Sequence, residues 1–192
     1  MLGSDGFGCG GSLIARDVVL TAAHCRNVTM YAVLGRHDLN DDDGEVIAAR
    51  EVIPHPGYSD YIFPNDFMLV FLADAYTADN VNVVKLNSDP SLPTVGQSLT
   101  VMGRGDTDVD LVSTLSEDLL SVDVIAISNE DCEASEGYDE LGEYWTYAGM
   151  ITTDMLCAEA DGKGSCHGDS GGPLVIKGDD GSADVQVGVV SL

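Results

Sequence analysis

Two short segments near opposite ends of the chain place the strongest constraint on its fold. Segment 168–173 reads Gly-Asp-Ser-Gly-Gly-Pro and sets Ser170 among glycines, where the backbone can bend tightly and approach another molecule. Segment 21–25 reads Thr-Ala-Ala-His-Cys and sets His24 beside a cysteine. A serine hydroxyl is a weak nucleophile at neutral pH and becomes reactive beside a base that a third group orients. If the two segments act together, the fold must bring them into contact across most of the chain.

Asp66, in the Asn-Asp-Phe-Met-Leu-Val segment at 65–70, is the candidate for the group that orients the histidine. Each segment alone also has an ordinary structural interpretation. Glycine-rich strings form turns, a histidine after two alanines can be a packing residue, and aspartate is common in turns. The three roles occurring together favour a catalytic triad of Ser170, His24 and Asp66 over three unrelated turns.

The composition is that of a globular chain with an unusual charge. The 192 residues are 44% hydrophobic, with 22 glycines and 6 prolines, which predicts a compact core in one domain or two small ones. Thirty-three acidic residues against eight basic ones give a net charge of −25, which argues against nucleic acid and anionic membranes as partners. We interpret this charge as an aid to solubility in acidic or salty surroundings, in preference to the alternative of a specific cationic partner. No apolar run approaches the roughly 20 residues of a membrane helix.

Short strand signals separated by glycine and aspartate turns dominate the chain. They predict strands at residues 18–20, 30–34, 45–53, 67–72, 99–102, 119–125, 155–158, 173–176 and 185–191. Only 128–134 has a helical pattern, with Ser128 as a possible N-cap and Asp131 three residues later. Segment 87–93 contains two serines and two prolines and is typical of a linker. The pattern predicts an all-β sandwich or barrel.

Taken together, these motifs resemble the chymotrypsin/trypsin-like serine peptidases, whose triad follows the chain order His, Asp, Ser. Here that order is His24, Asp66, Ser170. Further similar segments follow the family order at 7–14, 34–39, 55–58 and 187–191, and the likeness is weakest between about 106 and 153. The resemblance implies an all-β fold of two antiparallel Greek-key β-barrels, with the active site in the cleft between them.

The linker-like segment near the midpoint suggests where the two barrels divide. We expect an N-terminal β-barrel at residues 1–90 that carries His24 and Asp66. We expect a C-terminal β-barrel at residues 91–192 that carries Ser170 and is incomplete relative to the family. The triad would then be assembled from both barrels.

The resemblance implies a serine endopeptidase that hydrolyses peptide bonds in proteins through an acyl-enzyme. Ser170 would attack the peptide carbonyl, His24 would move the proton, and Asp66 would fix the imidazole tautomer. The backbone N–H groups of Gly168 and Ser170 would form the oxyanion hole. The expected partners are polypeptide substrates and protein inhibitors of peptidases. The alternative is a non-catalytic homologue that retains the fold as a binding or inhibitory module.

Three residues are expected at the substrate pocket on the strength of the resemblance. Gly164 stands where trypsin-like members carry the aspartate that recognises Lys or Arg, and Ser165 follows it. An uncharged pocket floor favours an uncharged side chain at P1, the residue before the cleaved bond. Ser191 matches a family serine that hydrogen-bonds the triad aspartate, although a buried strand serine would fit the sequence equally well.

Five cysteines without a zinc-binding spacing indicate disulfides and an oxidising compartment, so we expect a secreted, extracellular protein. The resemblance pairs Cys9 with Cys25 and Cys132 with Cys157. It leaves Cys166 over, because the partner of that cysteine in the family lies beyond the last residue of this chain.

Relative to the family, the sequence is expected to be a fragment. Residues 1–6 have neither a signal-peptide pattern nor the Ile-Val-Gly-Gly-like terminus that activation of the family's zymogens releases. In relatives the released amino group pairs with the residue corresponding to Asp169. We therefore expect the gene product to be a longer zymogen, and the fragment by itself to be weakly active or inactive.

No metal or cofactor is expected. The acidic cluster at 41–45 invites a calcium interpretation, because Ca²⁺ prefers several oxygen ligands and some relatives bind calcium in the corresponding loop. However, Arg36 stands where those relatives place a ligating carboxylate, and its positive charge repels a metal. A solvated hairpin tip is the preferred interpretation. We expect a monomer without nucleic-acid or membrane partners.

Overall fold

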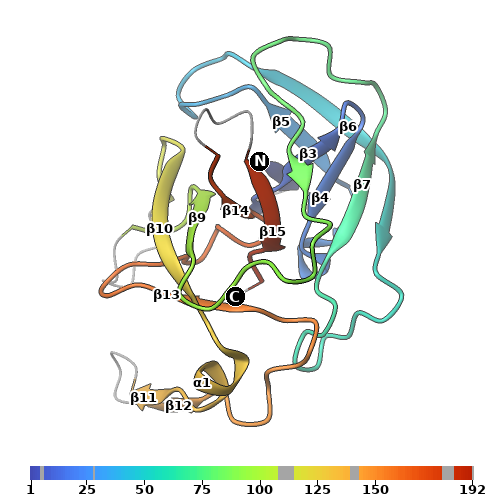
Figure 1. Cartoon of the computed structure of the whole chain (residues 1–192). Helices are drawn as coiled ribbons and strands as arrows, with labels where there is room; N and C mark the ends of the chain where they lie inside the picture. The colour runs from blue at the N-terminus through green and yellow to red at the C-terminus, as the bar shows by residue number, and fades with distance from the viewer. Residues whose placement is uncertain (5–6, 28, 108–114, 139–142, 179–183, 192) are drawn as a thin grey trace.

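The computed structural model describes residues 1–4, 7–27, 29–107, 115–138, 143–178 and 184–191 (Figure 1). It confirms the fold class predicted from the sequence. The described residues form two large, mostly antiparallel β-sheets in a double β-barrel arrangement, with a short α-helix and a small hairpin beside them. No helix among them is long and apolar enough to cross a membrane.

The first sheet has seven strands in the order β2-β1-β5-β6-β7-β4-β3, and all neighbours are antiparallel. Its strands are β1 Leu2–Ser4, β2 Phe7–Cys9, β3 Ser12–Ala15, β4 Val18–Thr21, β5 Tyr31–Leu34, β6 Glu45–Pro54 and β7 Met68–Leu72. Alternate residues of β7 are buried: Met68, Val70 and Leu72 are at most 1% exposed. Because β7 lies between β6 and β4, this burial fixes the position of Asp66 just before it.

The second sheet has six strands in the order β13-β10-β9-β14-β15-β8. Its strands are β8 Lys85–Leu86, β9 Ser98–Gly103, β10 Leu120–Ile127, β13 Cys157–Glu159, β14 Pro173–Ile176 and β15 Val185–Val189. This sheet has a hydrophobic core separate from that of the first sheet, formed by Leu99, Val101, Val124, Ala126, Leu174 and Val190. β8 pairs with β15 in the parallel direction. Because β8 belongs to this sheet, the chain enters the second sheet just before the linker-like segment at 87–93. The division into residues 1–90 and 91–192 remains our proposal.

The helix prediction is confirmed in detail. Helix α1 covers Asn129–Glu133, and the Asp131 N–H donates to Ser128 Oγ at 3.0 Å. This bond satisfies one of the backbone donors that a helix start leaves open. The sequence patterns did not predict β1, β2, β3, β8, β11 (Glu136–Tyr138) or β12 (Tyr144–Thr146). These strands have two to four residues and carry no clear apolar or β-branched signal of their own, and pairing with neighbours defines them.

Two disulfides join the pairs that the family resemblance implies, Cys9–Cys25 and Cys132–Cys157. The first ties β2 to the 3-10 turn η1 (Ala23–Cys25), which carries His24. The second ties α1 to β13. Cys166 is a free, exposed thiol.

A backbone contact joins the two halves of the molecule at Gly10. Its N–H donates to the Ser170 carbonyl at 2.7 Å, while its own carbonyl accepts from Thr21 Oγ1 at 2.8 Å. A Cβ atom at Gly10 would lie 2.6 Å from Gly172 Cα, which is closer than real Cβ contacts allow. Only glycine therefore lets the two backbones meet here.

Arg104 makes a second connection between the halves. Its side chain is 8% exposed, and its guanidinium donates to the carbonyls of Arg36, His37 and Glu117. The first two carbonyls belong to the loop between β5 and β6, and the third lies just before β10. Buried polar groups need such partners, and these bonds hold the loops together.

Replacing Gly10 by alanine should destabilise the fold by about 2–4 kcal/mol, because the methyl group overlaps Gly172 and weakens the bond to Ser170. Urea unfolding measures the change. Gly164→Ala is the matched control, since a Cβ there would meet open space. Equal unfolding midpoints for Gly10→Ala and the unmodified protein would contradict the assigned contact.

Candidate active site

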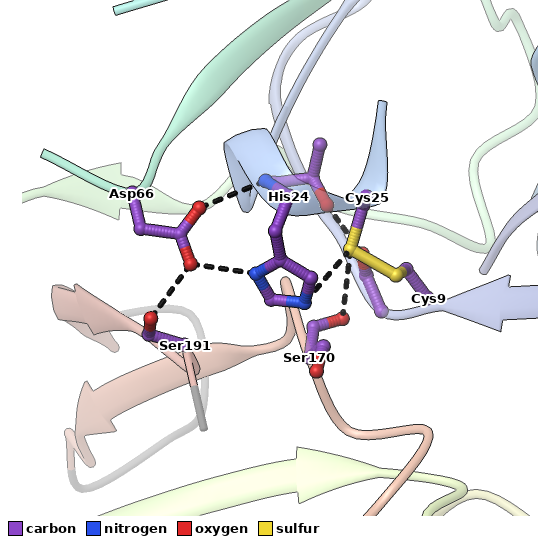
Figure 2. Close-up of a disulfide and its surroundings, with 8 residues drawn as sticks. Cys9, His24, Cys25, Asp66, Ser170 and Ser191 are labelled. Atoms are coloured by element: carbon purple, nitrogen blue, oxygen red, sulfur yellow. Dashed lines mark hydrogen bonds and ion pairs between the residues drawn. A yellow bond between two sulfur atoms is a disulfide. The ribbon is translucent and has the colours of Figure 1, made fainter. Parts of the chain in front are cut away.

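His24 and Asp66 are joined by two hydrogen bonds. The His24 ring donates from Nδ1 to Asp66 Oδ2 at 2.6 Å, and the His24 backbone N–H donates to Oδ1 at 2.9 Å (Figure 2). The first bond fixes the proton of the neutral ring on Nδ1, so Nε2 is left as the acceptor. The second bond fixes the carboxylate against the turn that carries the ring. Together they orient the imidazole.

Ser191 adds a third donor to this carboxylate. It follows β15, and its Oγ donates to Asp66 Oδ2 at 2.6 Å, as Figure 2 shows. The resemblance implied this bond, whereas the sequence alone left a buried strand serine as an equal alternative. The second sheet thus contributes directly to the environment of Asp66.

The charged form of Asp66 is stabilised although the residue is only 8% exposed. Burial by itself raises the pKa of this carboxyl group. The hydrogen bonds from the His24 ring, the Ser191 hydroxyl and the His24 N–H outweigh burial and bring the pKa below its ordinary value. A negative charge therefore lies beside the imidazole and stabilises it when it takes up a proton.

Ser170 lies on the side of the imidazole opposite Asp66, in the turn before β14 (Figure 2). Gly171 has a φ of 81°, and a Cβ there would lie 2.6 Å from the Gly10 carbonyl oxygen, so this turn requires glycine. Among the described residues, no hydrogen bond joins Ser170 Oγ to His24. His24 Nε2 instead lies 3.8 Å from Cys25 Sγ. A hydrogen bond between a serine hydroxyl and its base is often long without substrate and shortens in the complex with substrate.

The segment before Ser170 presents two unused backbone donors. Gly168 has a φ of 94°, a conformation that favours glycine. Within the described part of the chain, the N–H groups of Gly168 and Ser170 donate to no other residue. Between them the Asp169 carboxylate is buried and accepts from the Gly105 N–H at 2.7 Å and the Cys166 N–H at 2.9 Å. These bonds hold the carboxylate inward, which constrains the two flanking N–H groups.

The loop before Asp66 is strained and is held from the second half of the chain. Ile62, Phe63 and Asn65 have positive φ angles of 55°, 50° and 53°, which cost roughly 1–3 kcal/mol each. The Asn65 N–H donates to Asp154 Oδ2 at 2.6 Å, and this contact stabilises the loop. The Phe63 ring meets the His24 ring edge-on at 6.1 Å between centroids. Nothing in the sequence around Asp154 indicated this contact.

A cavity of about 1050 Å³ opens beside these residues. Three expected pocket residues, Gly164, Ser165 and Ser191, line it together with Asp66. His24 and Ser170 are not among the residues that line it. The structure therefore brings the expected pocket residues to one cavity that reaches the aspartate of the His24–Asp66 pair.

The described residues offer no convincing metal site. Their one compact group of possible ligands is Cys9, His24 and Cys25, but the two sulfurs form a disulfide and provide no thiolate. In the acidic loop at 41–45, Arg36 Nε donates to the Asp43 carbonyl at 2.8 Å. A guanidinium thus hydrogen-bonds one oxygen of this loop and adds a positive charge beside it, which favours the solvated hairpin tip over a calcium site.

Comparison with known proteins finds one matching family model and relatives from the same family. Residues 2–192 match the family model for trypsin. The chain is 36% identical over 174 residues to a trypsin from Squalus acanthias, covering 88% of this chain and 70% of that protein. It is also 36% identical over 188 residues to trypsin-10 from Gadus morhua, covering 95% and 69%, respectively. The identity to serine protease 1 from Rattus norvegicus is likewise 36%, over 88% of this chain and 65% of that protein.

Replacing Asp66 by asparagine should lower the free energy of unfolding at pH 7 by about 1–3 kcal/mol, because hydrogen bonds to a charged group are lost. The pKa of Asp66 is lower in the folded protein than its unfolded value of about 3.9. Its stabilisation is therefore complete above that value and is lost as the pH falls through the folded pKa. The difference between Asp66→Asn and the unmodified protein should shrink accordingly.

Urea unfolding of both proteins between pH 7 and pH 2.5 measures this difference. The control is Asp74→Asn, which changes an exposed aspartate in the bend after β7 and should have little effect at any pH. A difference for Asp66→Asn that stays constant over the whole range would show that the Asp66 charge does not carry the effect.

Proposed function

The chain belongs to the trypsin family of serine endopeptidases, and on this premise we propose that Ser170, His24 and Asp66 are its catalytic triad. The observation that carries the proposal is the 2.6 Å bond from His24 Nδ1 to Asp66 Oδ2, with Ser170 on the other side of the ring (Figure 2). This arrangement leaves the basic nitrogen of the ring available to a serine hydroxyl.

The proposed reaction proceeds through an acyl-enzyme. His24 Nε2 takes the proton of Ser170 Oγ as the oxygen attacks the peptide carbonyl, and it then gives this proton to the leaving amine. Asp66 remains ionised and stabilises the imidazolium ion. Water then releases the acyl group with His24 again acting as the base. The N–H groups of Gly168 and Ser170 donate to no other described residue, which supports their assignment to the oxyanion hole, where one such donor is worth about 3 kcal/mol.

We further propose that the protein is a secreted monomer acting on polypeptides, with protein inhibitors as additional partners. The two disulfides support an oxidising compartment. The competing function is that of a non-catalytic homologue that uses the same cleft for binding. The retained His24–Asp66 geometry favours the endopeptidase function over the binding function, because binding alone does not require an imidazole that a carboxylate orients.

A fluorophosphonate probe tests the triad directly. The mature protein, with the termini that it carries in its host, should be labelled at Ser170, and Ser170→Ala should abolish labelling. Asp66→Asn should reduce the labelling rate by about 10⁴, the loss typical of a triad with the wrong histidine tautomer. Mass spectrometry of the labelled peptide identifies the residue. Folded mature protein that stays unlabelled while a trypsin is labelled in parallel would favour the binding module.

A second proposal concerns which substrate side chain the pocket prefers at P1. Gly164 and Ser165 line the cavity without a charge, and a Cβ at Gly164 would meet open space. We expect cleavage after apolar or aromatic residues to be at least tenfold more efficient, in kcat/KM, than cleavage after Lys or Arg. Peptides that differ only at P1 provide the measurement. Faster cleavage after Arg than after Phe or Leu would overturn this assignment.

A further inference from the structure

The small hairpin formed by β11 and β12 has two faces with different surroundings. Cross-strand pairing puts Tyr138 opposite Tyr144 and Glu136 opposite Thr146, so these residues share one face. Trp145 pairs with Gly137 on the other face and lines the large cavity together with Tyr147. The hairpin thus extends one wall of the proposed substrate cleft. In Figure 1 it lies next to α1, apart from the two large sheets.

The first of these faces, here called the tyrosine face, consists of Glu136, Tyr138 and Tyr144. Tyr138 and Tyr144 are 74% and 55% exposed, and their rings meet edge to face at 5.6 Å between centroids. The Tyr144 hydroxyl donates to Glu136 Oε2 at 2.6 Å. This bond raises the pKa of Tyr144, so its hydroxyl stays protonated. Two electron-rich rings and a carboxylate therefore share one exposed surface.

These groups suit a cation, and the described chain supplies none to them. No ion pair among the described residues involves Glu136. No Lys, Arg or His occurs in the sequence between Arg104 and Lys163, while seven Asp or Glu occur from Asn129 to Glu143. Ammonium and guanidinium groups bind to the faces of tyrosine rings and pair with carboxylates. The surface thus complements a positively charged partner in charge and in its exposed aromatic rings.

We propose that the tyrosine face binds a Lys- or Arg-containing segment of the polypeptide substrate, at a distance from the bond that is cleaved. The identity of the occupant as substrate rests on the proposed endopeptidase function. Two observations favour this occupant. The opposite face of the hairpin borders the cleft through Trp145 and Tyr147, so a chain that leaves the cleft passes close to the tyrosine face, and the net charge of −25 attracts basic chains. A second copy of this chain, with the same negative charge, is disfavoured by repulsion.

The test measures binding separately from cleavage. The ligand is a fluorescein-labelled decapeptide of alternating Lys and Ser, and the protein carries Ser170→Ala so that the peptide stays intact. Fluorescence anisotropy gives the Kd. Tyr138→Ala/Tyr144→Ala should raise Kd about fivefold to tenfold, since each exposed cation–π contact is worth a factor of about two to five. Tyr138→Phe/Tyr144→Phe keeps the rings and should retain most of the affinity.

A matched pair of charge changes separates the tyrosine face from the overall field. Glu136→Gln should raise Kd about twofold to threefold, whereas Glu51→Gln, at an exposed position on β6, should leave it nearly unchanged. Equal binding by the double alanine variant and the parent would overturn the proposal, as would equal effects of the two Glu→Gln changes. If sedimentation shows that the protein self-associates through the tyrosine face and that this excludes the peptide, the face binds a second copy of the chain instead.

Cleavage by the mature enzyme distinguishes this inference from the proposed function. The double alanine variant should lose about fivefold in kcat/KM toward a substrate with a Lys-rich flank and keep its kcat/KM toward a short reporter. If the parent protein cleaves neither substrate, the proposed endopeptidase function is refuted. The anisotropy measurement alone then decides whether the tyrosine face binds basic peptides. Equal losses on both substrates would contradict the tyrosine face as a separate binding surface.

Discussion

The contact between Gly10 and Ser170 is the constraint on which the rest of the site depends. Its 2.7 Å backbone hydrogen bond joins the segment after β2 to the segment before β14, and the Cys9–Cys25 disulfide ties the same segment to the turn of His24. The serine and the histidine are thus positioned through one short stretch of backbone. Hydrogen bonds and a disulfide hold relative positions better than loose packing does, and catalysis is sensitive to displacements of about 1 Å.

The aspartate is held by both halves of the molecule in a similar way. Ser191 donates to its carboxylate from the second sheet, and Asp154 holds the strained loop just before it. Buried β7 fixes the other side of the loop. The charge of Asp66 and its depressed pKa are consequences of this convergence, because its donors come from segments far apart in the sequence.

The sequence predicted those parts of the structure that depend on local patterns or on motifs. Apolar and β-branched segments predicted β6, β7, β9 and β10, and Ser128 with Asp131 predicted the start of α1. Very short strands such as β8 and β11 exist because a neighbour pairs with them, and no local signal predicts that. The role of Gly10 depends on Gly172, and the role of Asp154 depends on Asn65. Such roles are set by distant partners that a single sequence does not reveal.

The central claim is that the fold brings the Ser170 hydroxyl to the free nitrogen of an imidazole oriented by Asp66. A crystal structure of the mature protein with a bound peptide aldehyde tests it most directly. We expect a bond between Ser170 Oγ and the aldehyde carbon, with His24 Nε2 within roughly 2.6–3.2 Å of the reacting oxygens and the His24–Asp66 bond intact. An aldehyde bound in the cleft with Ser170 unmodified, and with its hydroxyl directed away from His24, would contradict the account.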